Sequence, residues 1–310
     1  MLRLLVLGSA AGGGFPQWNS NDTASQRARA GDPLARPRTQ SSIAVTADDR
    51  RWVIVNASPD LRQQINDNPP LHPKEGRRHS PIASVVLTNG DVDHVAGLLT
   101  LRESHPLSVY GTPRILAILA ANSIFNVLNP EFVERREIAL GQAFEAKDRD
   151  GRGTGVVMEP FAVPGKVALH QEDAGAGPGF GTQPEDTIGL RIGTANGSGH
   201  FFYVPACARM TEDLARRLYG AALVLFDGTL WRDDEMVAAG VGRKTGRRMG
   251  HISVGDPDGS IAAFQPIEVK RKIFVHVNNT NPMLMDDSAE RAAAAAAGWE
   301  VAHDGMEIML

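Results

Sequence analysis

Metal-ligand side chains cluster at the end of a short apolar segment. Asp91, Asp93 and His94 follow the run SVVLT and precede a stretch with helical spacing. Carboxylate and imidazole groups bind metal ions, and three of them within four residues are hard to explain by packing. The alternative is a solvated acidic N-cap, in which Asp91 or Asp93 accepts hydrogen bonds from free helical N–H groups. These residues alone leave both interpretations open.

Two further candidate residues lie where strands are expected to end, and a third lies in a loop. Asp227 in LVLFDGTLW and His276 in IFVHVNNTNP each follow a strongly apolar run, and His251 in GRRMGHISV lies in a glycine-bounded loop. Sites in α/β proteins form where the C-terminal ends of strands meet. The pattern predicts one site that gathers these residues. For His276 the alternative is a buried histidine whose ring binds a carbonyl.

A basic run, Arg243, Lys244, Arg247 and Arg248, comes directly before His251. A solvated loop is one interpretation, because exposed charges usually contribute little. The other is a clamp for substrate carboxylates, which guanidinium groups bind in bidentate geometry. The single cysteine, Cys207, is expected to be a small core residue.

Strands and helices alternate along the chain, and several strands are continuous apolar runs typical of sheets covered on both faces. Strands are predicted over residues 3–9, 41–47, 51–58, 84–89, 107–111, 154–163, 187–193, 200–206, 222–228 and 271–279. Helices are predicted over residues 60–68, 95–104, 113–128, 211–220 and 286–299. Residues 17–45 are expected to form a long polar loop, and residues 1–310 a single domain.

Composition limits the classes of function. The 310 residues are 42% hydrophobic and 22% charged, as in well-cored soluble proteins. A net charge of −4 gives no basic footprint for nucleic acid. The N-terminal segment is expected to be a strand rather than a secretory signal, and no run is long enough for a membrane span. A cytoplasmic location is therefore expected, in a reducing compartment that suits one free cysteine.

Five motifs carry a resemblance to a known family. LGSAAGGGFPQWN, TNGDVDHVAGLL, LFDGTLW, MGHISV and HVNNTNP occur in this order. Together they closely resemble the B proteins of pyrroloquinoline quinone (PQQ) biosynthesis, which are similar to metallo-β-lactamase-fold proteins. The resemblance implies an α/β (α+β) fold, a four-layer αββα sandwich. Many family members carry a Cys-x-Cys-x-x-Cys cluster suited to structural zinc. Here Ser20, Asp22 and Ser25 replace those cysteines, so we expect no thiolate site and a mobile loop.

The resemblance also implies an altered metal loop. The superfamily pattern H-x-H-x-D-H corresponds here to residues 89–94, in which Asn89 and Asp91 replace the two leading histidines. The implied ligands are Asp93, His94 and His276, with Asp91 as a fourth ligand or an acceptor that orients a histidine. Two imidazoles and one carboxylate form the facial triad of non-haem Fe(II) oxygenases, although the same set also binds Zn(II).

The family's implied activity is iron-dependent hydroxylation of a tyrosine ring in a Glu–Tyr cross-linked, amino-acid-like PQQ precursor. Its partners would be that precursor, O₂ and an unidentified reductant, and a homodimer is an open alternative to a monomer. Asp227 and His251 are expected to bind substrate or transfer protons near the metal. Two alternatives stay open: a metal-dependent hydrolase of the same fold, and a carrier that transports PQQ or its precursor toward the periplasm.

Overall fold

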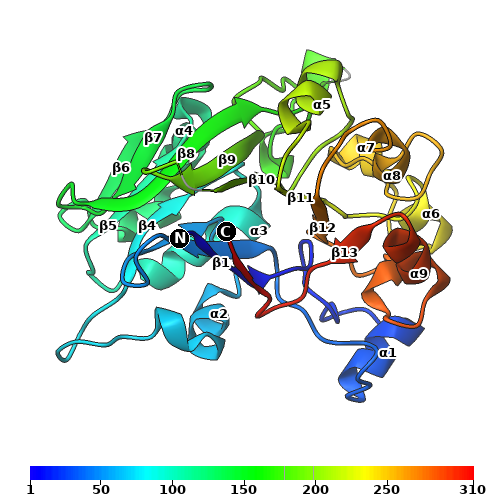
Figure 1. Ribbon diagram of the computed structural model, residues 1–310, viewed down its shortest axis with the longest axis horizontal. Helices are drawn as coiled ribbons and strands as arrows, with labels where there is room; N and C mark the ends of the chain where they lie inside the picture. The colour runs from blue at the N-terminus through cyan, green and yellow to red at the C-terminus, as the bar shows by residue number, and fades with distance from the viewer. Residues whose placement is uncertain (178, 198) are drawn as a thin grey trace.

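Two mixed seven-stranded sheets face each other in this computed structural model, and helices cover their outer sides (Figure 1). The structure describes residues 1–177, 179–197 and 199–310. The first sheet has the order β14-β1-β2-β3-β4-β5-β6. Its strands are β1 (Arg3–Gly8), β2 (Ser42–Thr46), β3 (Trp52–Val55), β4 (Ile82–Val86), β5 (Leu107–Gly111), β6 (Val133–Glu137) and β14 (Glu307–Met309).

The second sheet has the order β13-β12-β11-β10-β9-β8-β7. Its strands are β7 (Phe144–Lys147), β8 (Gly153–Ala162), β9 (Ile188–Thr194), β10 (His200–Val204), β11 (Leu223–Asp227), β12 (Arg271–Val275) and β13 (Trp299–Val301). The α-helices are α1 (Thr23–Arg29), α2 (Leu61–Asp67), α3 (Val92–Val95), α4 (Pro113–Ala121), α5 (Glu212–Leu218), α6 (Glu235–Ala238), α7 (Gly246–Met249), α8 (Ser260–Ala263) and α9 (Ala289–Ala296).

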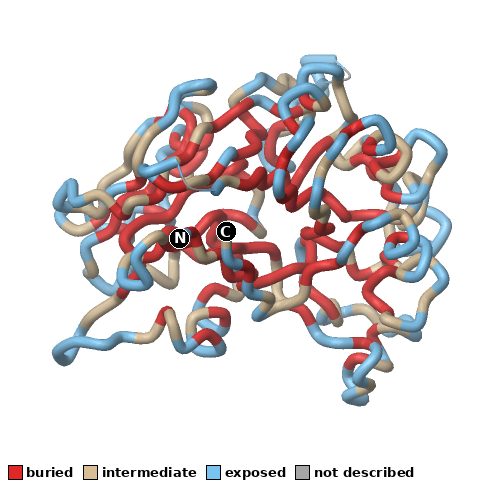
Figure 2. Tube along the Cα trace, in the orientation of Figure 1, coloured by how far each residue is buried: buried red, intermediate tan, exposed pale blue. Residues whose placement is uncertain are grey.

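Three apolar cores separate four layers. Successive residues of β12 point to opposite sides: Ile273 and Val275 fill the core between the sheets, whereas Phe274 packs in the outer core with residues of α5 and α9. On the other side, α2 and α4 cover the first sheet. Figure 2 shows the strands as a buried centre with exposed loops around it. The predicted αββα sandwich is confirmed, and burial on both faces explains the continuous apolar strands.

The predicted helix over residues 95–104 is wrong in form. The chain makes only one α-turn, α3, and continues as the 3-10 helix η2 (Ala96–Leu101). The backbone of residues 94–97 forms hydrogen bonds with the segment after β3. Ala57 N donates to the His94 carbonyl, and Gly97 N donates to the Ala57 carbonyl. The helix ladder is interrupted because these groups serve tertiary contacts, and the exchange fixes the position of His94.

The polar segment 17–45 is not a continuous loop, because it contains α1. Asp22 starts that helix, since its carboxylate accepts a hydrogen bond from the backbone N–H of Ser25. The helix predicted over 113–128 is also shorter than expected. It ends at Ala121, where the Asn122 side chain donates to the Ile118 carbonyl, and a 3-10 turn follows.

Four strands were missed by the sequence patterns, namely β6, β7, β13 and β14, and each is an edge strand of its sheet. The β7–β8 hairpin includes both ends of the charged, glycine-containing stretch 146–155. Across the described ranges, no helix has the length and apolar character needed to cross a membrane.

Candidate metal centre

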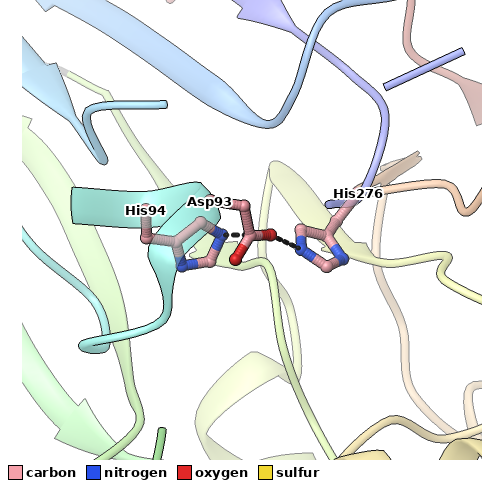
Figure 3. A group of neighbouring side chains, drawn as sticks. All are labelled: Asp93, His94 and His276. Atoms are coloured by element: carbon pink, nitrogen blue, oxygen red, sulfur yellow. Dashed lines mark hydrogen bonds and ion pairs between the residues drawn. The ribbon is translucent and has the colours of Figure 1, made fainter. Parts of the chain in front are cut away.

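Asp93, His94 and His276 converge at one edge of the sandwich (Figure 3). Asp93 and His94 come from α3, which follows the first sheet's β4, whereas His276 follows the second sheet's β12. Asp93 Oδ2 lies 3.1 Å from His276 Nε2 and 3.9 Å from His94 Nε2. In Figure 3 the carboxylate lies between the two rings. The site therefore joins strand ends of both sheets.

Asn89 fixes the ring of His94. Asn89 Oδ1 accepts a hydrogen bond from the backbone N–H of Asp91, which distinguishes the amide oxygen from the amide nitrogen. The same Oδ1 accepts a second hydrogen bond from His94 Nδ1 at 2.8 Å. The Nδ1 atom consequently carries the proton, and Nε2 presents a lone pair. That Nε2 is buried and has no hydrogen-bond partner among the described residues. An unpartnered buried acceptor is costly, and a metal ion would satisfy it.

Thr229 fixes the ring of His276 in the same way. The hydroxyl lies 2.6 Å from Asp227 Oδ1 and 2.9 Å from His276 Nδ1. Because a carboxylate only accepts, the hydroxyl donates to Asp227 and its oxygen accepts from the histidine N–H. His276 Nε2 faces Asp93 and is the nitrogen free to bind a metal; without a metal it carries the proton that it donates to Asp93 Oδ2 at 3.1 Å. Sequence reasoning missed Thr229, although it stands two residues after Asp227.

The backbone at His276 is unusual. Its φ of +58° lies in the left-handed region, which residues other than glycine rarely adopt. The neighbouring residue holds it there: Val277 N donates to the Ser9 carbonyl, and Ala11 N donates to the Val277 carbonyl. The glycine-rich segment after β1 therefore clamps the chain beside the site.

Asp227 and His251 occupy different depths. Asp227 is fully buried, and its Oδ2 accepts hydrogen bonds from Cys207 N and His251 Nδ1, both at 2.8 Å. It therefore acts through Thr229 and His251 rather than on a substrate directly. His251 lines the cavity, and its Nδ1 donation leaves Nε2 as the acceptor nitrogen.

The donor set fits a metal ion. Donors about 2.0–2.2 Å from a common ion lie roughly 3–3.5 Å apart, close to the spacings around Asp93 Oδ2. Burial lowers the pKa of His94 to about 4, so this ring is neutral and ready to coordinate. Burial disfavours the charged forms of Asp93 and His276, but the attraction between opposite charges in the site outweighs burial. The pKa of Asp93 is therefore lowered, and the pKa of His276 is raised. A bound cation would replace the His276 proton.

Asp91 is neither a helix cap nor an orienting acceptor. It stands at the N-cap position of α3, but its side chain makes no capping hydrogen bond. Its Oδ1 instead accepts from the backbone N–H of Leu169, across the cavity mouth. Asn89 and Thr229, rather than Asp91, accept the hydrogen bonds that orient the two histidine rings. Asp91 lines the cavity beside the triad, where a direct ligand role stays a prediction.

The cavity at this site measures about 420 Å³ and is lined by the triad, His251 and apolar side chains such as Met236 and Met249. Lys244 is the one member of the basic run among the described lining residues, and Lys166 joins it from a distant segment. Arg243 is exposed, and Arg247 pairs with Asp258 away from the cavity. Arg248 pairs with Glu172.

A polar cluster occupies the place of the family's cysteines. The Asp22 carboxylate accepts hydrogen bonds from Ser20, Ser25 and the side chain of Asn279. Asn279 Oδ1 in turn accepts from Gln17 N and the Ser25 hydroxyl. This cluster ties α1 to the segment after His276, whereas the mobility expected of the loop stays a prediction.

Comparisons with known proteins agree with this fold. The model of the β-lactamase superfamily domain matches residues 51–277. Coenzyme PQQ synthesis protein B of Gluconacetobacter diazotrophicus is 54% identical over 99% of both chains, and that of Methylorubrum extorquens (strain PA1) is 53% identical over the full length of both. The crystal structure of zinc-bound PqqB from Methylobacterium extorquens matches with a TM-score of 0.93 and 53% identity, covering 99% of this chain and 100% of that one.

A diphosphatase of the PhnP family shares the fold, with a TM-score of 0.68 and 20% identity. The match covers 100% of this chain and 98% of the diphosphatase chain. Fold and matched residues thus define a member of the β-lactamase superfamily. Within that superfamily, the chain belongs to the family of coenzyme PQQ synthesis protein B.

Proposed function

We propose that this protein acts in PQQ biosynthesis as an Fe(II)- and O₂-dependent hydroxylase of the tyrosine ring in the Glu–Tyr cross-linked precursor. The observation that carries the proposal is the triad of Asp93, His94 and His276 on a cavity wall, with both imidazoles oriented to present Nε2. Two imidazoles and one carboxylate leave coordination positions open, as O₂-activating iron sites require.

Asp93, His94 and His276 would hold the Fe(II) ion, which would supply the redox chemistry needed to use O₂. In the net reaction a ring C–H becomes C–OH, the second oxygen atom leaves as water, and a two-electron reductant supplies the remaining electrons. His251 faces the cavity and is suited to take up or return a proton at Nε2. Asp227 orients His251 and Thr229, and through Thr229 it keeps His276 in the ligating tautomer.

The positions of Asn89 and Asp91 weigh against a dinuclear hydrolase. A dinuclear site would need a second set of ligands to hold a bridging hydroxide. Asp227, His251 and His276 are close enough to form such a set, but Nδ1 of each histidine is engaged in a hydrogen bond, His251 with Asp227 and His276 with Thr229. Asn89 instead accepts from His94, and Asp91 accepts from Leu169 N. A one-metal zinc hydrolase remains the alternative that the zinc-bound relative favours. The cytoplasmic location and a homodimer stay predictions.

The deciding experiment is anaerobic reconstitution of metal-free protein with Fe(II) or Zn(II), followed by addition of the cross-linked precursor, a two-electron reductant such as ascorbate, and O₂. We expect oxygen uptake and a product heavier by oxygen with Fe(II) alone, and loss of both in His276→Ala. Hydrolytic turnover with Zn(II) would replace the hydroxylase by a one-metal hydrolase. Tight precursor binding without turnover under either metal, unchanged in Asp93→Ala, would identify a carrier.

A further inference from the structure

Two lysines from distant segments meet on the wall of the metal cavity. Lys166 follows β8, and Lys244 precedes α7. The stem of Lys166 packs on Gly250: a Cβ at Gly250 would lie 3.0 Å from Lys166 Cγ, and the glycine has a φ of +90°. This contact places the lysine next to His251, because Gly250 directly precedes that histidine.

Glu172 holds the two lysines together. Its carboxylate lies 3.5 Å from Lys166 Nζ and 3.6 Å from Lys244 Nζ, and the Glu172 side chain is only 12% exposed. Arg248 donates to both oxygens of the same carboxylate, at 3.1 and 2.8 Å. The hydrogen bonds from Arg248 and the charges of the lysines lower the pKa of Glu172 to about 2, so the carboxylate stays ionised at neutral pH.

The charges in this cluster do not balance. Three cations surround one carboxylate, and the bidentate pair with Arg248 alone neutralises it. The Arg248 guanidinium also lies over the Phe180 ring, 3.6 Å from its centroid, which anchors the pair behind the cavity. The positive charges of Lys166 and Lys244 therefore exceed the negative charge left on Glu172, and both lysines line the cavity.

We propose that Lys166 and Lys244 form a subsite for a carboxylate of an aromatic substrate, and that the Glu172–Arg248 pair positions them. The subsite rests on the proposed function, because it assigns one end of the substrate whose ring is hydroxylated. Met236 and Met249 give the same cavity an apolar wall for a ring, and 420 Å³ accommodates a small aromatic amino acid.

The test measures binding without metal or O₂, so that it is independent of turnover. Metal-free protein is titrated calorimetrically with 3-(4-hydroxyphenyl)propanoate, with tyramine as the phenol that lacks a carboxylate, and with inorganic phosphate. We expect saturable binding of the propanoate, weakened about tenfold or more by Lys166→Met and by Lys244→Met. Lys270→Met, which removes an exposed lysine that does not line the cavity, is the matched control and leaves binding unchanged.

Rescue by Lys244→Arg would separate loss of charge from loss of packing, and thermal melting of each variant checks that it folds. Equal propanoate binding by wild type and the double lysine variant would overturn the subsite, as would absence of saturable binding or equal binding of tyramine. Lysine-dependent binding of phosphate in preference to the propanoate would overturn the assignment to a carboxylate. Absence of hydroxylation alongside lysine-dependent binding would reject the proposed function alone.

Discussion

At the scale of single residues, neutral groups orient both ligand imidazoles. Asn89 and Thr229 accept the Nδ1 protons of His94 and His276, and the carboxylate of Asp227 acts one step further away, through Thr229. Such outer partners commonly set metal affinity, because they determine which ring nitrogen is free and where it points. Thr229 is therefore expected to affect metal affinity, although the triad and not the Thr229 hydroxyl would bind the metal ion.

Thr229→Val keeps the side-chain shape and removes the hydroxyl. We expect roughly 10- to 100-fold weaker Zn(II) and Fe(II) binding, because His276 loses its Nδ1 acceptor and its fixed tautomer. Competition with a chromogenic chelator measures the affinity. Thr229→Ser is the matched control and should retain wild-type metal affinity. Wild-type affinity in Thr229→Val would show that the hydrogen bonds from Asp227 through Thr229 to His276 do not control metal binding.

Cys207 gives a clean measure of global unfolding. It is the only cysteine, it is fully buried, and burial raises the pKa of its thiol. We expect its reaction with Ellman's reagent at pH 8 to be slower in the native protein than in guanidinium by about 1,000-fold or more. Rapid labelling of the native protein would show that local opening at the end of β10 exposes the thiol.

At the scale of elements, the turn from α3 into η2 sets the position of two ligands. Gly97 allows it, because a Cβ there would lie 2.0 Å from the Ser58 carbonyl oxygen and 2.8 Å from that of Ala57. We expect Gly97→Ala to lower the free energy of unfolding by about 1–3 kcal/mol, measured by urea denaturation.

The matched control is Gly179→Ala, where the added methyl group meets no heavy atom of the described residues within 4 Å. It should change the stability by less than about 0.5 kcal/mol. Equal effects of the two changes would mean that the α3 turn adapts, and that the close approach at Gly97 does not control the ligand positions.

Sequence patterns located the inner strands of both sheets and missed the outer ones for a physical reason. Inner strands such as β11 and β12 are covered on both faces and are therefore apolar throughout. The edge strands β6 and β14 read VERRE and EIM, since an edge carries charges that prevent further pairing. Hydrophobic runs alone cannot indicate such strands.

The same limit applies to the site. Asp93, His94 and His276 were candidates because ligand types at strand ends are visible in the sequence, and the family resemblance implied that these three form the ligand set. Asn89 and Thr229 were not, because their roles follow from which ring they contact. Lys166 was missed as well, since only the fold brings the segment after β8 to that of Lys244.

At the scale of the whole molecule, one metal ion would link the two sheets, since the triad draws on β4 and β12. Zn(II) at 100 times its dissociation constant should add roughly 2.7 kcal/mol of stability and raise the melting temperature by roughly 5 °C. Calorimetry with and without Zn(II) measures this shift. It should vanish in Asp93→Asn and persist in Asp213→Asn, a change at an exposed carboxylate; a shift that survives Asp93→Asn would place the ion elsewhere.

The polar cluster around Asp22 has a consequence for the cell's metal supply. Side-chain and backbone hydrogen bonds hold α1 beside His276, where the family's cysteines would suit a structural zinc. Folding of this segment therefore consumes no zinc and presents no thiolate to oxidants. We therefore expect the metal found in purified protein to be bound at the triad, because the Asp22 cluster offers no thiolate ligand.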